Sequence, residues 1–265
     1  MNSIVEKYIV SEISGNGSWA FDNKLAAYNF IRSQEPKIKY MIMPSYEAAL
    51  PSELEFRATI VVCVYMAPLR TLRAIESCLA QDTTGVEIIV YGDGCQNLAN
   101  LINSHYFDEK IIEQQLKGND LVVLNLEKNY GGFGYMQRNL ARNISRGKYT
   151  MYLDGDDVLL PNHVSTRLEI AESNDFDLIG FETQIPFPFG GYRDTRFEYG
   201  KIGHAEIVIR TSYLKQLPVS SPDYGHDWTL IRDAMEAGAR RFIKTGLPRT
   251  YIIKSLPNFK EQGID

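Results

Sequence analysis

From residue 57 onward, short apolar runs alternate with segments in which apolar residues recur at helical spacing. The first run, Ala58–Val64, is rich in β-branched residues and contains no charged residue. A continuous apolar run of this length is typical of a parallel strand that is covered on both faces. The segment that follows has the periodicity of a helix, with apolar residues at Leu69, Leu72, Ile75 and Leu79. We therefore expect a strand and then a helix here.

The same alternation continues along the chain. Further strands are expected at Val86–Tyr91, Asp120–Asn125, Tyr149–Leu153, Phe176–Ile185, Arg241–Lys244 and Arg249–Ile253. Further helices are expected at 96–117, 133–146, Asn162–Asn174 and Asp227–Ala237. This order predicts an α/β fold with a mostly parallel central sheet flanked by helices, in which ligands collect beyond the carboxyl ends of the strands. Residues 186–200 are aromatic and glycine-rich, and predict an irregular loop suited to a lid or an acceptor-facing flap.

Residues 1–56 differ from the rest of the chain. They mix tyrosine, isoleucine and leucine with polar residues, show no strong periodicity, and end in the proline-containing stretch Pro44–Pro51. We expect them to form an N-terminal extension, separate from a domain made by residues 57–265.

Composition limits the classes of partner. Of the 265 residues, 44% are hydrophobic and 23% are charged, as in an ordinary globular protein, and the net charge is -5. No basic run supplies the charge that a nucleic-acid backbone requires, so we expect no nucleic-acid partner. The three cysteines are scattered without metal-type spacing, which favours a reducing compartment.

The chain offers no obvious membrane segment. Its longest apolar run, Thr59–Leu69, contains a proline and is shorter than the roughly 20 residues that span a bilayer. The first residues lack the charged and apolar regions of a signal peptide. We expect cytoplasmic residence, with docking on the inner face of the membrane left open.

Carboxylates gather at the end of one expected strand. The run from Tyr149 ends in Asp154, Asp156 and Asp157. Clustered carboxylates repel one another and are costly to desolvate, so they favour a site where a divalent cation supplies compensating charge. Mg²⁺ or Mn²⁺ is usually held by one or two carboxylates together with substrate phosphates, which makes a nucleoside diphosphate the expected third component. The alternative is a solvated Asp-Gly turn.

Four features follow one another in a specific order. The first strand ends in Cys63–Tyr65, the second is followed by Gly92–Cys95, the glycine-rich segment Asn129–Gly134 precedes Arg138, and Asp154–Asp157 comes last. This order resembles that of the family 2 glycosyltransferases of GT-A fold, in which an Asp-Asp-Gly-Ser-like turn, an Ala-Arg-Asn helix and an Asp-x-Asp-Asp motif follow one another in the same order. The resemblance extends from Ala58 to Ser255 and implies a single GT-A domain that binds a nucleotide sugar.

The resemblance implies roles for the donor side of the site. Tyr65, beside Cys63 at the strand end, would border the nucleobase, and Asp93 would accept the imide hydrogen of uracil or thymine. A carboxylate can also read guanine through its N–H groups, so a UDP-sugar is favoured over other donors without excluding them. The alternatives are a core aromatic residue at Tyr65 and a turn-forming aspartate at Asp93.

The same resemblance assigns the phosphate region. Gly131 and Gly132 would let the backbone approach the nucleotide, and Arg138 would face the phosphates, unless it is a solvated helix arginine. Asp154 would contact the ribose, or the ion through water, and Asp156 would ligate Mn²⁺ or Mg²⁺. Asp157 is expected to cap the following helix or to support the ligands from behind.

On the acceptor side, the segment Tyr224–Leu230 resembles the Gly-Glu-Asp-Trp segment whose aspartate is the base in inverting members of the family. Asp227 would inherit that role, with Trp228 as apolar cover that holds its pKa closer to neutrality. Asp227 could instead be a helix N-cap. His226 stands where the family carries glutamate, and is expected to alter acceptor contacts.

Two further positions bear on this hypothesis. Lys254 stands where many relatives carry a histidine near the metal or phosphate, and a protonated lysine would pair with the diphosphate instead. His204 lies where the family often forms the acceptor floor, but we expect it to be a surface histidine.

The sequence therefore predicts an inverting glycosyltransferase that moves a sugar from a nucleotide donor to a hydroxyl of a saccharide or a lipid-linked glycan. A haloacid-dehalogenase-type phosphatase fits less well, because Asp157 stands where that class needs glycine. A nucleotidyltransferase lacks support, because no glycine-rich loop with a lysine follows the first strand. A catalytically silent module that binds sugar nucleotides or carbohydrate stays open, because of His226 and Lys254.

Overall fold

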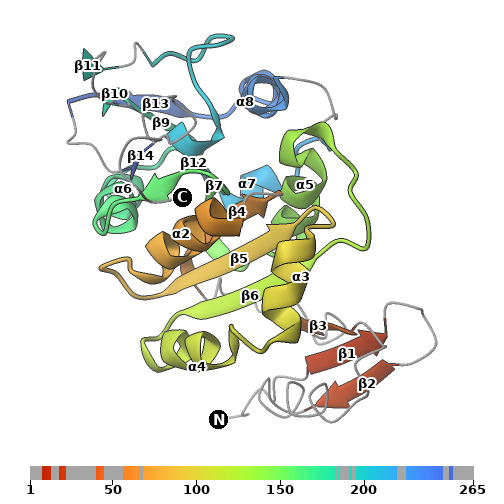
Figure 1. The fold of residues 1–265 in the computed structure, drawn as a ribbon. Helices are drawn as coiled ribbons and strands as arrows, with labels where there is room; N and C mark the ends of the chain where they lie inside the picture. Colours follow the sequence, from red (N-terminus) through yellow and green to blue (C-terminus); the bar gives the residue numbers. More distant parts are fainter. Residues whose placement is uncertain are drawn as a thin grey trace, which may run out of the picture. The chain divides into compact units, whose positions relative to one another are not determined.

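The chain divides into two compact units, Met1–Glu53 and Leu54–Asp265. The computed structural model, drawn in Figure 1, describes residues 8–12, 18–21, 40–44, 56–65, 68–182, 184–185, 191–192, 195–219, 225–246 and 251–252. In the first unit, the strands β1 (Tyr8–Glu12), β2 (Ser18–Phe21) and β3 (Tyr40–Pro44) form an antiparallel sheet in the order β2-β1-β3. The sequence pattern did not predict these strands.

A seven-stranded sheet organises the second unit. Its order is β13-β9-β12-β7-β4-β5-β6. The strands are β4 (Phe56–Val64), β5 (Val86–Gly92), β6 (Asp120–Asn125), β7 (Gly147–Asp154), β9 (Leu178–Phe181), β12 (Ile207–Arg210) and β13 (Arg241–Lys244). β12 runs antiparallel to both of its neighbours, and the other four pairings are parallel. The expectation of an α/β fold with a mostly parallel sheet is confirmed.

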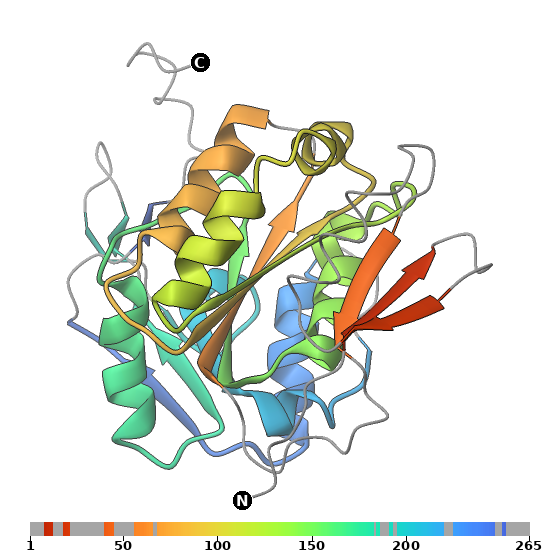
Figure 2. The same cartoon turned by 90° about the horizontal axis from the view of Figure 1, so that it is seen from below.

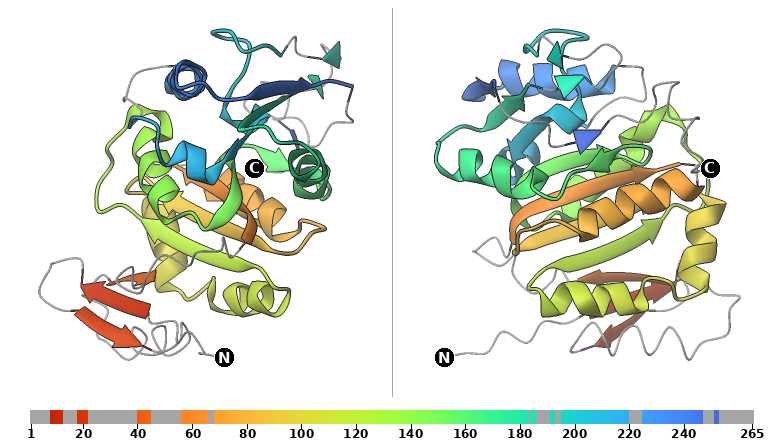
Figure 3. Two further views of the ribbon diagram at one scale, coloured as in Figure 1. Left: turned by 180° about the vertical axis from the view of Figure 1, so that it is seen from behind. Right: turned by 60° about the vertical axis from the view of Figure 1, so that its left-hand side comes forward.

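Helices cover both faces of this sheet. Their bounds are α2 (Pro68–Leu79), α3 (Gln96–Asn103), α4 (Asp108–Leu116), α5 (Tyr135–Ile144), α6 (His163–Glu172), α7 (Thr211–Leu214) and α8 (His226–Glu236), with short 3-10 turns η1 (Gly132–Gly134) and η2 (His204–Glu206). Figure 2 shows α2 and α4 on one face and α5 and α8 on the other. α4 packs beside the edge strand β6, as the views of Figure 3 show.

Two small pairings complete the second unit. β8 (Val158–Leu159) pairs with β14 (Tyr251–Ile252), and β10 (Gln184–Ile185) pairs with β11 (Gly191–Tyr192), both antiparallel. The predictions of one strand over 176–185 and of no regular structure over 186–200 were therefore wrong in detail.

The helix predicted over residues 96–117 is two helices, α3 and α4. His105 lies between them with φ at 60°, in the left-handed region. A right-handed helix cannot continue through a residue in that conformation, so the chain turns and starts again at Asp108. Helical spacing of apolar residues on both sides of His105 concealed the break.

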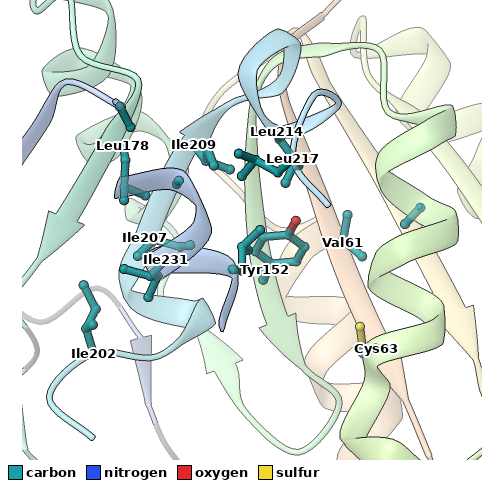
Figure 4. Close-up of a cluster of buried hydrophobic side chains, with 14 of the residues drawn as sticks. Val61, Cys63, Tyr152, Leu178, Ile202, Ile207, Ile209, Leu214, Leu217 and Ile231 are labelled. Carbon is teal, nitrogen blue, oxygen red and sulfur yellow. The ribbon is translucent and has the colours of Figure 1, made fainter. Parts of the chain in front are cut away.

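The core follows from the alternation of side chains along the central strands. β4 directs Val61 and Cys63 to the face covered by α5, α7 and α8, where they join a buried cluster. Figure 4 shows Tyr152 at the centre of this cluster, between Val61 and Cys63 on one side and Ile207 and Ile231 on the other. Ile60 and Val62 are buried on the opposite face. Each such side chain contributes about 1.5–3 kcal/mol by leaving water.

A polar network closes the sheet at the end where its parallel strands begin. The carboxylate of Glu87, which is 1% exposed, accepts hydrogen bonds from Thr59 Oγ1 at 2.7 Å and from Arg146 Nε at 2.7 Å. Arg146 also pairs with Asp120. The Thr59 hydroxyl in turn accepts the backbone N–H of Gly147 at 2.9 Å. Three adjacent parallel strands and the start of β7 are therefore joined through one buried carboxylate.

We expect Glu87→Gln to lower the free energy of unfolding by about 3 kcal/mol, because it leaves a largely buried guanidinium without one of its compensating charges. Urea denaturation monitored by circular dichroism measures the change. The matched control is Glu172→Gln, which neutralises the exposed pair of Glu172 with Arg57 and should cost less than about 1 kcal/mol. Equal losses in the two variants would contradict the account of this network.

Candidate active site

The expected site residues share one edge of the sheet. In the parallel pairing of β4 with its neighbours, Cys63 lies opposite Asp154 of β7, and Val64 lies opposite Gly92 of β5. Asp93 and Asp154 therefore lie on either side of β4, two strand spacings or roughly 10 Å apart. The acidic groups assigned to the nucleoside and to the phosphates are thus brought to the same carboxyl edge, as the sequence predicted.

The turn after β5 is held by close backbone contacts. Gly94 has φ at 61°, and a Cβ there would collide with the backbone carbonyl carbon of Lys128, so the position requires glycine. The carboxylate of Asp93 is buried and accepts the backbone N–H groups of Tyr130 at 2.8 Å and Gly131 at 3.0 Å. Asp93 thereby fixes the glycine-rich loop to the end of β5, a contact that the sequence did not predict.

Arg138 of α5 lies beneath this edge and is only 5% exposed. Its Nη2 donates to Asp154 Oδ1, and its Nη1 donates to the carbonyl oxygen of Phe133 at 2.7 Å. The same Nη1 lies 2.9 Å from Nε2 of His226. The alternative of a solvated helix arginine was therefore wrong, because tertiary contacts bury the guanidinium at the centre of the site.

The surroundings of Arg138 depend on a glycine and on acidic neighbours. Gly134 has φ at 86°, and a Cβ there would lie 2.6 Å from Arg138 Nη1, so a larger residue would displace the guanidinium. Burial by itself lowers the pKa of Arg138, but the acidic groups of Cys63, Asp154 and Asp227 help to raise it above the ordinary value. Arg138 is a permanent buried cation.

The two carboxylates at the end of β7 are in different environments. The Asp154 side chain is 53% exposed, although one oxygen is held by Arg138. Asp156 is partly buried, and its pKa is raised, first by desolvation and then by the charge of Asp154, while Arg70 of α2 partly offsets both. Arg70 is a residue of the site that the sequence reasoning missed, since an exposed charge at the start of a helix carries no distinctive signal.

Asp154 and Asp156 are the residues at this turn that could hold a divalent cation together with the phosphates of a substrate. Within the part of the chain that the structure describes, no cluster of three or more His, Cys, Asp or Glu side chains could hold a metal ion. Ions that keep several waters need only one or two carboxylates when phosphates supply further ligands. The pKa of Asp156 is raised first by desolvation and only then by the charge of Asp154, so its ionised form is disfavoured in the folded protein.

Asp157 does not cap a helix. Its backbone N–H donates to the carbonyl oxygen of Asp154 at 3.0 Å, which closes the turn, and β8 follows directly. The next helix, α6, begins at His163 with Asn162 at its N-cap. The capping prediction was wrong because the short strand β8 separates Asp157 from the helix, whose start was predicted correctly. The side chain of Asp157 is buried.

The start of α8 brings the proposed base to the same place. The N-cap is Gly225, with φ at 93°, so Asp227 is not the N-cap residue. Asp227 Oδ1 accepts a hydrogen bond from the backbone N–H of Trp228 at 2.7 Å, and the charge of Asp227 helps to raise the pKa of Arg138. Trp228 is partly exposed and packs against the core cluster.

His204 is part of this site and is not a surface histidine, so that prediction was wrong. The residue is 6% exposed. Its ring stands edge-on to Tyr152, with 5.1 Å between the ring centroids, and its centroid lies 5.0 Å from that of the His226 ring. Burial, followed by the positive charge of Arg138, lowers the pKa of His204 well below its usual value. The apolar run that begins at Ile207 was the available signal, because it places His204 directly before a buried strand.

The remaining expected residues are placed as follows. Tyr65 is 52% exposed at the end of β4, which rules out the alternative of a core aromatic residue. Cys63 is buried in the core cluster beside Gly134, and burial raises the pKa of its thiol to about 11. Any contact of Cys63 with a nucleotide-sugar donor would therefore be made by its backbone. Gly132, with φ at 69°, opens η1. Lys254 lies outside the described residues.

Comparison with known proteins decides the family. A family model described as "Glycosyl transferase family 2" matches residues 59–237, which include every site residue named above except Lys254. The chain belongs to glycosyl transferase family 2.

Curated relatives agree with this assignment. An uncharacterised glycosyltransferase of Methanocaldococcus jannaschii is 32% identical over 123 residues, which are 46% of this chain and 39% of that protein. The succinoglycan biosynthesis protein ExoO of Rhizobium meliloti is 28% identical over 115 residues, 43% of this chain and 30% of that protein. The chain thus spans well under half the length of these relatives.

Solved structures share the fold. A crystal structure of S. aureus TarS covers 75% of this chain and 60% of its own, with a TM-score of 0.59 at 16% identity. The mannosyltransferase PcManGT from Pyrobaculum calidifontis, in complex with GDP-Man and Mn²⁺, covers 78% of this chain and 60% of its own, with a TM-score of 0.58 at 14% identity. At these identities the likeness concerns the GT-A-like fold. None of the described helices is long and apolar enough to cross a membrane.

The aspartate Asp156 at the end of β7 lowers the stability of the folded protein when it is ionised. The pKa of Asp156 is raised, so the folded protein holds its proton more tightly than the unfolded chain does. The stability that comes from binding this proton is fully present below the unfolded pKa of about 3.9. It is lost as the pH rises through the folded pKa, because Asp156 then becomes charged. We therefore expect Asp156→Asn to raise the melting temperature of the metal-free protein near neutral pH, with a gain that disappears in acid. Scanning calorimetry over this pH range measures it.

The matched control is Asp154→Asn, which removes the carboxylate that pairs with buried Arg138. We expect this variant to lose about 1–3 kcal/mol of stability, the opposite sign to Asp156→Asn. Destabilisation of similar size in both variants would show that the ionised carboxylate of Asp156 does not lower the stability of the folded protein.

Proposed function

We propose that the protein is an inverting glycosyltransferase that moves one sugar from a nucleoside diphosphate donor to a hydroxyl of a saccharide or lipid-linked glycan. The observation that carries the proposal is that Asp154 and Asp227 both act on Arg138, while Asp93 follows the neighbouring strand end on the same edge of the sheet. Each comes from a different element, and family 2 membership gives them a common chemistry. ExoO, named for succinoglycan biosynthesis, supports a role in making polysaccharide.

The donor is proposed to lie along this edge, with its nucleoside near Asp93 and its diphosphate near Asp156. Exposed Tyr65 offers a ring for the base, and each carboxylate oxygen of Asp93 retains a lone pair beyond its backbone contact. TarS has been crystallised with UDP and with UDP-GlcNAc, and PcManGT with GDP-Man. These ligands support a nucleotide-sugar donor, and the carboxylate at Asp93 favours a UDP-sugar.

Asp156 is proposed to hold Mn²⁺ or Mg²⁺, with Asp154 beside it. A divalent cation bound there would supply positive charge to the departing diphosphate. The chain's own contribution is to gather negative charge at the turn and to hold Asp154 in place through Arg138. Arg70, whose charge reaches Asp156, and Lys254 are proposed to add positive charge near the phosphates.

Asp227 is proposed to take the proton from the acceptor hydroxyl as that oxygen attacks the anomeric carbon, in a single displacement that inverts the configuration. Asp227 is partly exposed at the start of α8, and it is close enough to Arg138 to help raise the pKa of that guanidinium. His226 and Trp228 flank it, and the partly exposed Trp228 ring is proposed to meet the acceptor. A lipid-linked acceptor would bring the protein to the inner surface of the membrane.

We expect Asp227→Asn to lower sugar transfer by roughly 10²- to 10⁴-fold, because it removes the general base. Binding of UDP with Mn²⁺, read as a rise in melting temperature, should persist. The matched control is Asp233→Asn on the same helix, where the carboxylate pairs with Arg232. Undiminished turnover by Asp227→Asn would refute the assignment of the base.

Screening nucleotide sugars for thermal stabilisation, with and without Mn²⁺, identifies the donor. A ligand at about 100 times its Kd adds about 2.7 kcal/mol of stability, and this gain should require both Mn²⁺ and Asp156. Release of nucleoside diphosphate with sugar transfer supports the proposal, whereas release of pyrophosphate indicates a nucleotidyltransferase. Donor binding without hydrolysis or transfer to any acceptor tested would favour a silent binding module.

A further inference from the structure

The contact between Arg138 and His226 fixes the protonation state of the histidine. Nη1 of Arg138 and Nε2 of His226 lie 2.9 Å apart, and a guanidinium has only donors. Nε2 must therefore accept, which leaves the imidazole neutral with its hydrogen on Nδ1. A doubly protonated ring would set two cations against each other at this distance in a buried place, since His226 is 7% exposed.

His226 connects two sides of the site that are distant in sequence. It is the first residue of α8 and precedes Asp227, whereas Arg138 lies on α5 and is bonded to Asp154 and to Phe133 of the glycine-rich loop. Its ring also lies 5.0 Å from that of His204, at an interplanar angle of 33°. The start of α8 is thus joined to the donor side through one guanidinium.

A neutral acceptor at this position has a specific advantage. The resemblance to family 2 places glutamate here in other members, and a carboxylate against Nη1 would compete with Asp154 for the positive charge of Arg138. A neutral imidazole fixes the direction of the guanidinium without neutralising it. The charge of Arg138 then remains available to Asp154 and Asp227.

We propose that His226 is a positioning residue, whose neutral imidazole accepts a hydrogen bond from Arg138 and thereby holds Asp227 at a fixed place relative to Asp154. This inference rests on the proposed function for its kinetic consequence. The hydrogen bond itself does not, so the two parts can be tested separately.

The kinetic test compares three forms of the protein. His226→Leu removes the acceptor, and we expect kcat to fall roughly 10- to 100-fold, the effect of losing a hydrogen bond to a charged group. The affinity for UDP with Mn²⁺, measured by calorimetry, should stay near that of the wild type. His226→Gln supplies an amide oxygen as acceptor and should recover most of kcat. Loss of donor affinity with unchanged kcat, or equal loss in the Gln and Leu variants, would overturn the proposal.

The hydrogen bond is tested without turnover. Nitrogen-15 NMR of the histidine side chains distinguishes ring nitrogens that carry a proton from those that do not, and the spectrum of His226→Gln assigns the signals of His226. We expect Nε2 of His226 to be unprotonated and Nδ1 to be protonated at neutral pH. A protonated Nε2 overturns the proposal even if His226→Leu fails to fold. Failure of the wild type to bind nucleotide or transfer sugar would instead refute the proposed function, and leaves this result standing.

Discussion

A buried cation organises the site. Arg138 is almost inaccessible to water, and a guanidinium in such a place is tolerated only where charges and hydrogen-bond acceptors surround it. Its partners come from three places: the end of β7, the glycine-rich loop and the start of α8. Because one planar group contacts all three, its orientation and theirs are fixed together. The orientation of Asp154 and the position of the start of α8 follow from satisfying this one charge.

The sheet supplies the frame on which this arrangement rests. Parallel pairing of β4 with β5 and β7 brings three strand ends to the same level, and glycines at positions 94 and 134 allow the backbone and Arg138 to approach closely. The opposite end of the sheet is closed by the buried network around Glu87. Stability and chemistry are thus placed at opposite ends of the same strands, as is usual for open α/β sheets.

Much of the fold was readable from the sequence, because buried parallel strands are continuous apolar runs and the helices between them are amphipathic. The carboxylate edge was predicted for the same reason, since Asp93 and Asp154 directly follow such runs. The burial of Arg138 was not predictable from its own polar neighbours on α5, because its partners lie 16 and 88 residues away. The burial of His204 likewise depends on tertiary contacts, and the left-handed residue that breaks the helix at His105 leaves no mark in the apolar periodicity.

The central claim is that this edge, arranged around Arg138, binds the diphosphate of a nucleotide sugar. A crystal structure of the protein with UDP and Mn²⁺, with the ion located by its anomalous scattering, tests it most directly. The account predicts one manganese peak at Asp156, with the diphosphate beside it and the nucleobase near Asp93. Arg138 should still be bonded to Asp154 and His226. A nucleotide bound away from this edge, or an Arg138 withdrawn from Asp154 in the complex, would contradict it.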